Sequence, residues 1–181
     1  GYARTCPQHP GAIREEERSI GVSLKGGLQL LKGMFEWRRK RTGVITSTVA
    51  ESGAFCRVLP ESLRPDVEFE FIVGMVDDHN RKINLGHGYS LHVALVRPQS
   101  RGQVRLASPR PTDSMIIDPA FFRRAQDMTV LMKGLQREMA VMNAPAFDVH
   151  RGAMLYPVSP EDPADIEREI RRSSDTEYHP V

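Results

Sequence analysis

Apolar and polar residues alternate strictly in one central stretch of the chain. Val67, Phe69 and Phe71 alternate there with Glu68 and Glu70. A period of two is typical of a β-strand that buries one face and exposes the other. We therefore predict a strand over 67–73.

A second alternating stretch covers residues 89–96. One face carries Tyr89, Leu91, Val93 and Leu95, and the other carries Ser90, His92, Ala94 and Val96. Residues 98–102 are turn-forming, and residues 103–106 again have strand character, so the pattern predicts a hairpin of 89–96 with 103–106. A shorter strand is expected at 54–58.

Three other stretches have the spacing of helices, at about 15–41, 119–142 and 163–172. The second has a continuous apolar stripe with steps of three and four residues, made of Phe121, Ala125, Met128, Met132, Leu135, Met139 and Met142. Asp118 before Pro119 is a favourable start for that helix.

The first helical stretch has a similar stripe, Leu24, Leu28, Leu31 and Phe35, and a cationic end. It also contains Gly21, Gly26, Gly27 and Gly33, each costing roughly 1 kcal/mol against Ala in a helix interior. We expect this helix to be broken or mobile.

Hairpin strands with helices set apart from them predict an α+β fold, a mostly antiparallel sheet with helices packed on it. A length of 181 residues fits one domain over 1–181. Apolar residues make up 40% of the chain, enough for a core, and the net charge of +2 gives no general reason to expect nucleic acid as a partner.

The two cysteines, Cys6 and Cys56, do not make a disulfide framework. Cys6 and His9 have no second close pair, so no metal site is expected. The start has no signal-peptide pattern, and no apolar stretch is long enough for a transmembrane segment. These features favour a cytoplasmic protein and leave membrane association of a longer protein open.

Four segments in a fixed order carry a family resemblance. They are Tyr89–Val93, the turn Arg97-Pro98-Gln99-Ser100-Arg101-Gly102, the sequence Ile117-Asp118-Pro119, and the final Tyr178-His179-Pro180-Val181. In this order and spacing they resemble the glucose–methanol–choline (GMC) oxidoreductases, most closely the bacterial choline and alcohol dehydrogenases. The family's last motif continues with Gly-Thr.

The resemblance implies an antiparallel sheet that lies over a flavin and walls a substrate pocket. It implies a small-molecule alcohol as substrate and FAD as cofactor, held by a separate FAD-binding domain. No Gly-x-Gly-x-x-Gly occurs in this sequence, and Gly26-Gly27 lacks the strand context of a phosphate-binding loop. We therefore expect 1–181 to be one part of a larger flavoenzyme, inactive by itself and without cofactor-binding residues of its own.

The resemblance assigns the catalytic role to His179. Oxidation of an alcohol removes a hydroxyl proton and a hydride, and an imidazole with a pKa near 6.5 suits the proton at neutral pH. Without the family resemblance, the alternative for His179 is a surface histidine on a chain end that has no catalytic role. The family pairs this histidine with a second His or Asn, which would lie beyond Val181.

His92 is a weaker candidate, for substrate binding, with a buried structural histidine as the alternative. His87 is expected to be a loop residue without a role. The run Trp37–Arg41 is read as a solvated helix end, although it could contact phosphates or a membrane surface. Two other functions stay open: a non-catalytic interaction module that uses this basic run, and a purely structural domain. The sequence does not name the alcohol or the electron acceptor.

Overall fold

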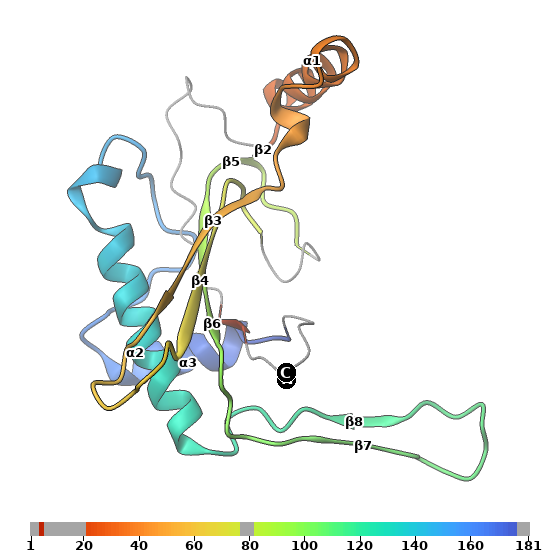
Figure 1. Ribbon diagram of the computed structural model, residues 1–181, viewed down its shortest axis with the longest axis vertical. Helices are drawn as coiled ribbons and strands as arrows, with labels where there is room; N and C mark the ends of the chain where they lie inside the picture. The colour runs from red at the N-terminus through yellow and green to blue at the C-terminus, as the bar shows by residue number, and fades with distance from the viewer. Residues whose placement is uncertain (1–3, 6–20, 77–81, 177–181) are drawn as a thin grey trace.

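The computed structural model describes residues 4–5, 21–76 and 82–176 (Figure 1). The strands are β1 (Arg4–Thr5), β2 (Gly21–Val22), β3 (Ala50–Cys56), β4 (Val67–Ile72), β5 (Gly86–His87), β6 (Ser90–Leu95), β7 (Gln103–Arg105) and β8 (Ile116–Asp118). The α-helices are α1 (Leu24–Lys40), α2 (Ala125–Met142) and α3 (Pro163–Ser173), with 3-10 turns η1 (Val44–Thr46) and η3 (Pro145–Phe147).

The central sheet has four strands in the order β1-β6-β4-β3, and every neighbouring pair is antiparallel. Two further pairs, β2 with β5 and β7 with β8, are also antiparallel. The expected α+β fold with a mostly antiparallel sheet is therefore confirmed. Figure 1 shows α2 and α3 on one side of the sheet, α1 projecting at one end and the β7–β8 arm at the other.

The core lies between the sheet and α2. Gly134 of α2 sits so close to the strands that an added Cβ would lie 2.8 Å from Val93 Cγ2 and 3.2 Å from Val67 Cγ1. Leu131 and Leu135 of α2 are fully buried against the same face. From Met128 to Met142 the predicted stripe is thus the core face, with its methionines in or against the core, whereas Ala125 is exposed and Phe121 lies before the helix.

The predicted pairing of residues 103–106 and the predicted start of the second helix are both wrong. Residues 103–106 do not pair with 89–96, because β6 already has β4 on one edge and β1 on the other. Strand β7 pairs instead with β8, in register Val104 to Ile117. The helix expected from Pro119 begins only at Ala125, since Asp118 ends β8 and both Ala120 and Phe122 have positive φ.

Within the described residues, the first helix also differs from the predicted 15–41, because Gly21–Val22 form β2 and not helix. Helix α1 begins at Leu24 behind the N-cap Ser23, whose hydroxyl accepts a hydrogen bond from Gly26 N at 2.9 Å. It runs without a break to Lys40 and ends at Arg41 in the left-handed conformation. The expectation of a broken helix is wrong for residues 24–40.

Candidate functional site

The two faces of the sheet differ in chemistry. Val93 points toward α2, so its neighbours along β6, Ser90, His92 and Ala94, lie on the opposite face, as the alternation predicted. The cross-strand register pairs Gly53 of β3 with Glu70 of β4, and Glu70 with His92 of β6. A carboxylate and an imidazole are therefore neighbours in one row across the sheet, where directly opposed residues have Cβ atoms about 4.5–5.5 Å apart.

His92 is buried, with 1% of its surface exposed. The position beyond Glu70 in this row is Gly53, where an added Cβ would come within 2.7 Å of Phe69 O. Residue 53 therefore adds no side chain beside Glu70. We call the row Gly53, Glu70 and His92 the polar row.

Ser90 fixes the loop that follows β4. Its hydroxyl donates to Gly74 O at 2.9 Å and accepts from Val76 N at 3.3 Å. Ser90 is fully buried and lies two residues before His92 on the same face. This loop is thereby held at the edge of the face that carries the polar row.

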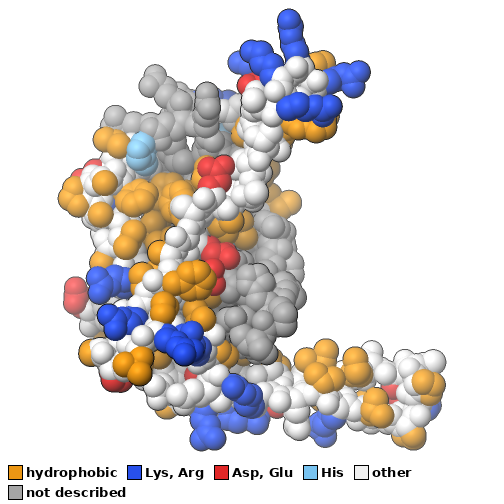
Figure 2. All heavy atoms as spheres, in the orientation of Figure 1, with side chains coloured by type: hydrophobic (Ala, Val, Ile, Leu, Met, Phe, Trp, Pro, Cys, Tyr) orange, Lys and Arg blue, Asp and Glu red, His pale blue; other side chains and the backbone are white. Residues whose placement is uncertain are grey.

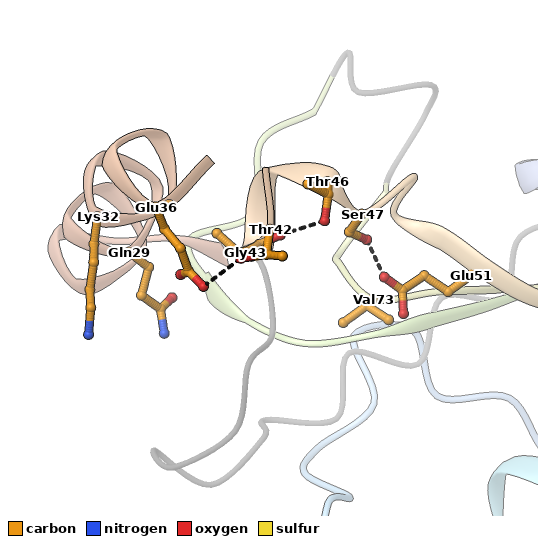
Figure 3. Close-up of a pocket in the computed structure, with 11 residues that line it drawn as sticks. Gln29, Lys32, Glu36, Thr42, Gly43, Thr46, Ser47, Glu51 and Val73 are labelled. Atoms are coloured by element: carbon orange, nitrogen blue, oxygen red, sulfur yellow. Dashed lines mark hydrogen bonds between the residues drawn. The ribbon is translucent and has the colours of Figure 1, made fainter. Parts of the chain in front are cut away.

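A cleft of about 660 Å³ lies at the end of the sheet where β3 begins and β4 ends. It is lined by α1, by η1 and by the start of β3 (Figure 3). Glu36 points from α1 toward Thr42 and accepts its hydroxyl hydrogen at 3.2 Å, and Glu51 accepts from Ser47. The volume is that of a typical small-molecule site, and the lining is polar and acidic with Lys32 as the cation.

The turn motif at 97–102 has a structural role in this domain. Both carboxylate oxygens of the buried Asp127, in the first turn of α2, accept backbone hydrogen bonds, from Gln99 N and Ser100 N at 2.8 Å each. In return the Ser100 hydroxyl accepts from Arg124 N at 3.0 Å and so caps the helix. We call these reciprocal bonds the turn–helix staple; they fix the start of α2 relative to the end of β6.

Glycine completes the motif for a geometric reason. A Cβ on Gly102 would overlap Asp118 O and come within 2.8 Å of Pro119 Cα. The first residue of the arm therefore packs directly on the backbone of the returning strand. The same Asp118, predicted to start a helix, instead accepts from Ala120 N at 2.9 Å and pairs with Arg123 at 3.1 Å.

The predicted site residues fall in different places. His179, and also His9 and His79, lie outside the described residues. His87 lies in β5, where its Nε2 is 2.7 Å from the hydroxyl of Ser23. The basic run ends α1 as expected, with the Arg41 guanidinium 4.3 Å from the centre of the Trp37 ring.

One residue that the sequence analysis passed over is Glu138 on α2. It is fully buried, and neither carboxylate oxygen has a hydrogen-bond partner within the described residues. Burial, and then the nearby Glu169 carboxylate of α3, raises the pKa of Glu138 well above its ordinary value. The sequence already indicated a buried carboxylate here, since Glu138 lies three residues after Leu135 and four before Met142, inside the apolar stripe.

Within the described ranges, no group of three or more His, Cys, Asp or Glu residues is arranged to hold a metal ion. The described helices also include none with the length and apolar character needed to cross a bilayer.

Solved structures of two oxidases share this fold. Pyridoxine 4-oxidase from Mesorbium loti matches 98% of this chain and 30% of its own chain, with a TM-score of 0.71 and 22% identity. Formate oxidase matches 99% of this chain and 36% of its own, with a TM-score of 0.80 and 18% identity.

Sequence comparison gives the family. The family model described as "GMC oxidoreductase" matches residues 98–181. An alcohol dehydrogenase [acceptor] of Pseudomonas putida is 37% identical over 165 residues, which is 90% of this chain and 30% of the relative. The mitochondrial choline dehydrogenase of Mus musculus is 30% identical over 146 residues, 80% of this chain and 24% of the relative.

The chain belongs to the GMC oxidoreductase family, as the ordered motifs suggested. It spans 30% of the length of the first relative and 24% of the second.

Proposed function

We propose that residues 1–181 form the substrate-binding domain of a longer, FAD-dependent alcohol dehydrogenase of the choline dehydrogenase type. The observation that carries the proposal is the 37% identity, over 90% of the chain, to an alcohol dehydrogenase. The polar row supports it, because the face opposite α2 carries an imidazole and a carboxylate where a substrate wall needs polar groups.

The described residues do not fit the diphosphate of FAD. Gly26, the one glycine near the start of α1 that is buried, packs against the carbonyl of Gly21, so its missing side chain makes room for the protein's own backbone. We therefore assign FAD to a second domain of the same longer protein, which would be the partner of this one. When bound there, the flavin supplies the hydride acceptor.

The part of the reaction that falls to this chain is the proton. Converting a CH–OH group to a carbonyl removes a hydride from carbon and a proton from oxygen, and we propose that His179 accepts the proton at an imidazole nitrogen. A neutral imidazole with a pKa near 6.5 is a suitable base at neutral pH. The Tyr178-His179-Pro180-Val181 segment lies within the residues that the family model matches, which supports the assignment.

We propose a secondary role for His92 in holding the substrate. It is buried on the sheet face opposite α2, next to Glu70 in register. The substrate would be a small alcohol. We also propose a cytoplasmic location, consistent with Cys56 being a free thiol in this fold.

The test is anaerobic stopped-flow reduction of the purified flavoprotein that contains this chain, with its best alcohol substrate. Positioned acid–base catalysis contributes about 10²–10⁴-fold, so His179→Ala should slow flavin reduction by that factor while FAD content stays unchanged. His92→Ala should mainly raise the substrate concentration that gives half-maximal reduction. A His179→Ala protein that reduces its flavin at the wild-type rate would contradict the assignment.

A further inference from the structure

Helix α3 leads to the segment that carries His179. The helix ends at Ser173, and His179 follows six residues later in the sequence. The chain that leaves the helix is tied back to its last turn. The Ser173 hydroxyl donates a hydrogen bond to Glu169 O at 2.8 Å. Ser174 N donates to Ile170 O at 2.9 Å. The position of this exit therefore depends on how the last turn of α3 packs.

Two carboxyl groups and one guanidinium meet between α2 and α3. Arg172 donates from Nε to Glu169 Oε2 at 2.7 Å and from Nη2 to Glu169 Oε1 at 2.6 Å, and its guanidinium lies 4.0 Å from the centre of the Tyr156 ring. The other carboxyl group is that of Glu138, which is 0% exposed and has no hydrogen-bond partner within the described residues. The guanidinium is thus committed to Glu169.

The other elements packed on α2 bring no second charge to Glu138 within the part of the chain that the structure describes. These elements are β4 and β6. Their titratable residues lie on the sheet face opposite α2 and are Glu68, Glu70 and His92. Tyr89 faces α2 but stacks on Phe147, with 5.8 Å between the ring centres. On α2 itself, the positions one turn from Glu138 are Gly, Leu, Val and Met at 134, 135, 141 and 142.

A negative charge on Glu138 would therefore be unfavourable. Figure 2 shows charged side chains spread over the surface of the molecule, where water solvates them, and Glu138 has no such access. Its burial, and then the Glu169 carboxylate, raise the pKa of Glu138 well above its ordinary value. When Glu138 is protonated, one guanidinium balances one carboxylate. When it is ionised, a second buried carboxylate is left without a counter-ion, which is strongly destabilising.

We propose that Glu138, in its protonated form, is a positioning residue for His179. It keeps the last turn of α3 packed on α2, and loss of its proton releases that turn and the chain that leaves it. The coupling runs through Glu169, which faces Glu138 and whose backbone oxygen binds the Ser173 hydroxyl. This role of Glu138 rests on the proposed function of His179.

The pH dependence of the reaction separates the two residues. His179 acts as a base, so its contribution is lost as the pH falls and the imidazole takes up a proton. Glu138 acts when protonated, so its contribution is present at lower pH and is lost as the pH rises through its raised pKa in the folded protein. His179 therefore limits the acidic side of the pH–rate profile, and Glu138 limits the alkaline side.

The experiment measures anaerobic flavin reduction by saturating alcohol in the purified flavoprotein that contains this chain, over roughly pH 6–10. We expect the wild-type rate to fall about tenfold per pH unit on the alkaline side. Glu138→Gln, which is neutral at every pH, should keep the rate there. Glu169→Gln should move the fall to higher pH, because the like charge beside Glu138 is gone. The matched control is Glu167→Gln, which removes an exposed pair with Arg171 at 2.7 Å on the same helix and should keep the wild-type profile.

Hydrogen–deuterium exchange at residues 174–176 is a readout that does not depend on activity. At a pH below the fall in rate, the wild type and Glu138→Gln should exchange equally fast. Above it, and at the same pH, the wild type should exchange about tenfold faster than Glu138→Gln, because the exit of α3 opens locally. The β7–β8 arm should show no difference between the two proteins.

A wild-type profile without an alkaline fall would overturn the proposal, as would the same fall in Glu138→Gln or equal exchange at 174–176 at high pH. Where Glu138→Gln does not fold or loses FAD, an unshifted profile in Glu169→Gln overturns it. His179→Ala tests the proposed function separately. Wild-type flavin reduction in His179→Ala would refute the role of His179, whereas slow reduction there together with an unchanged profile in Glu138→Gln would refute the positioning role alone.

Discussion

Replacing Asp127 by alanine should loosen the turn–helix staple more than any other single change at the sheet–helix junction. The side chain is buried, and its two oxygens accept hydrogen bonds from Gln99 N and Ser100 N at 2.8 Å each. Hydrogen bonds to a charged group contribute about 1.5–3 kcal/mol each, and both amides would be left without an acceptor. Alanine recovers roughly 0.7 kcal/mol through its helix propensity. We expect a net cost of about 3 kcal/mol.

The assay is hydrogen–deuterium exchange of the purified flavoprotein, read at the amides of Gln99 and Ser100. A local cost of about 3 kcal/mol corresponds to roughly 100-fold faster exchange if opening of this turn limits the rate. Asp127→Asn keeps one acceptor oxygen and should give an intermediate effect. The control is Asp113→Ala in the arm, where a surface pair with Arg110 at 3.1 Å contributes about 0–1 kcal/mol.

The reasoning fails if Asp127→Ala leaves exchange at both amides unchanged. It also fails if exchange accelerates equally across α2 and β6, because that pattern would mean global destabilisation and no local staple.

Two other predictions concern stability. Glu138→Gln should raise the free energy of unfolding by roughly 1–3 kcal/mol at about pH 8, because the amide carries no charge into the core. Burial raises the pKa of the Glu138 carboxyl in the folded protein. The stability linked to its protonation is therefore fully present below the pKa of this group in the unfolded chain, about 4.3, and is lost as the pH rises through its pKa in the folded protein. Urea unfolding over that pH range should therefore show a weaker pH dependence for Glu138→Gln, and an unchanged profile would contradict the prediction. Gly102→Ala should destabilise the fold by several kcal/mol, since its Cβ would overlap the backbone at Asp118. Gly27→Ala, with open space around residue 27, should stabilise α1 by up to about 1 kcal/mol. Thermal unfolding compares the two variants, and equal shifts of the unfolding temperature would refute the prediction.

The sequence alone determined the elements whose signal is local. The period of two over 67–73 and 89–96 gave strands β4 and β6 with the correct faces, because alternation is a property of the extended backbone itself. The apolar stripe from Met128 to Met142 gave the core face and the end of α2, because a period of 3.6 residues is a property of the helical backbone itself. The ordered motifs also identified the family, since they depend on residue type and order and not on coordinates.

Strand pairing was not predictable from local pattern. Residues 103–106 follow β6 after a turn, yet they pair with β8, because both edges of β6 are taken by strands distant in sequence. The start of α2 was likewise decided by tertiary contacts: the Ser100 hydroxyl, 24 residues upstream, caps the helix at Arg124 and not at Pro119.

The orientation of α1 is the clearest case that only the tertiary structure decided. Its leucine stripe predicts a buried face, and the periodicity is correct, but periodicity does not say which face meets the domain. Gly26 and Gly33 allow the helix backbone to lie against Gly21 and η1 at a distance that no side chain permits. That close backbone packing turns the leucines outward, so the sequence determined the stripe and the fold determined what it faces.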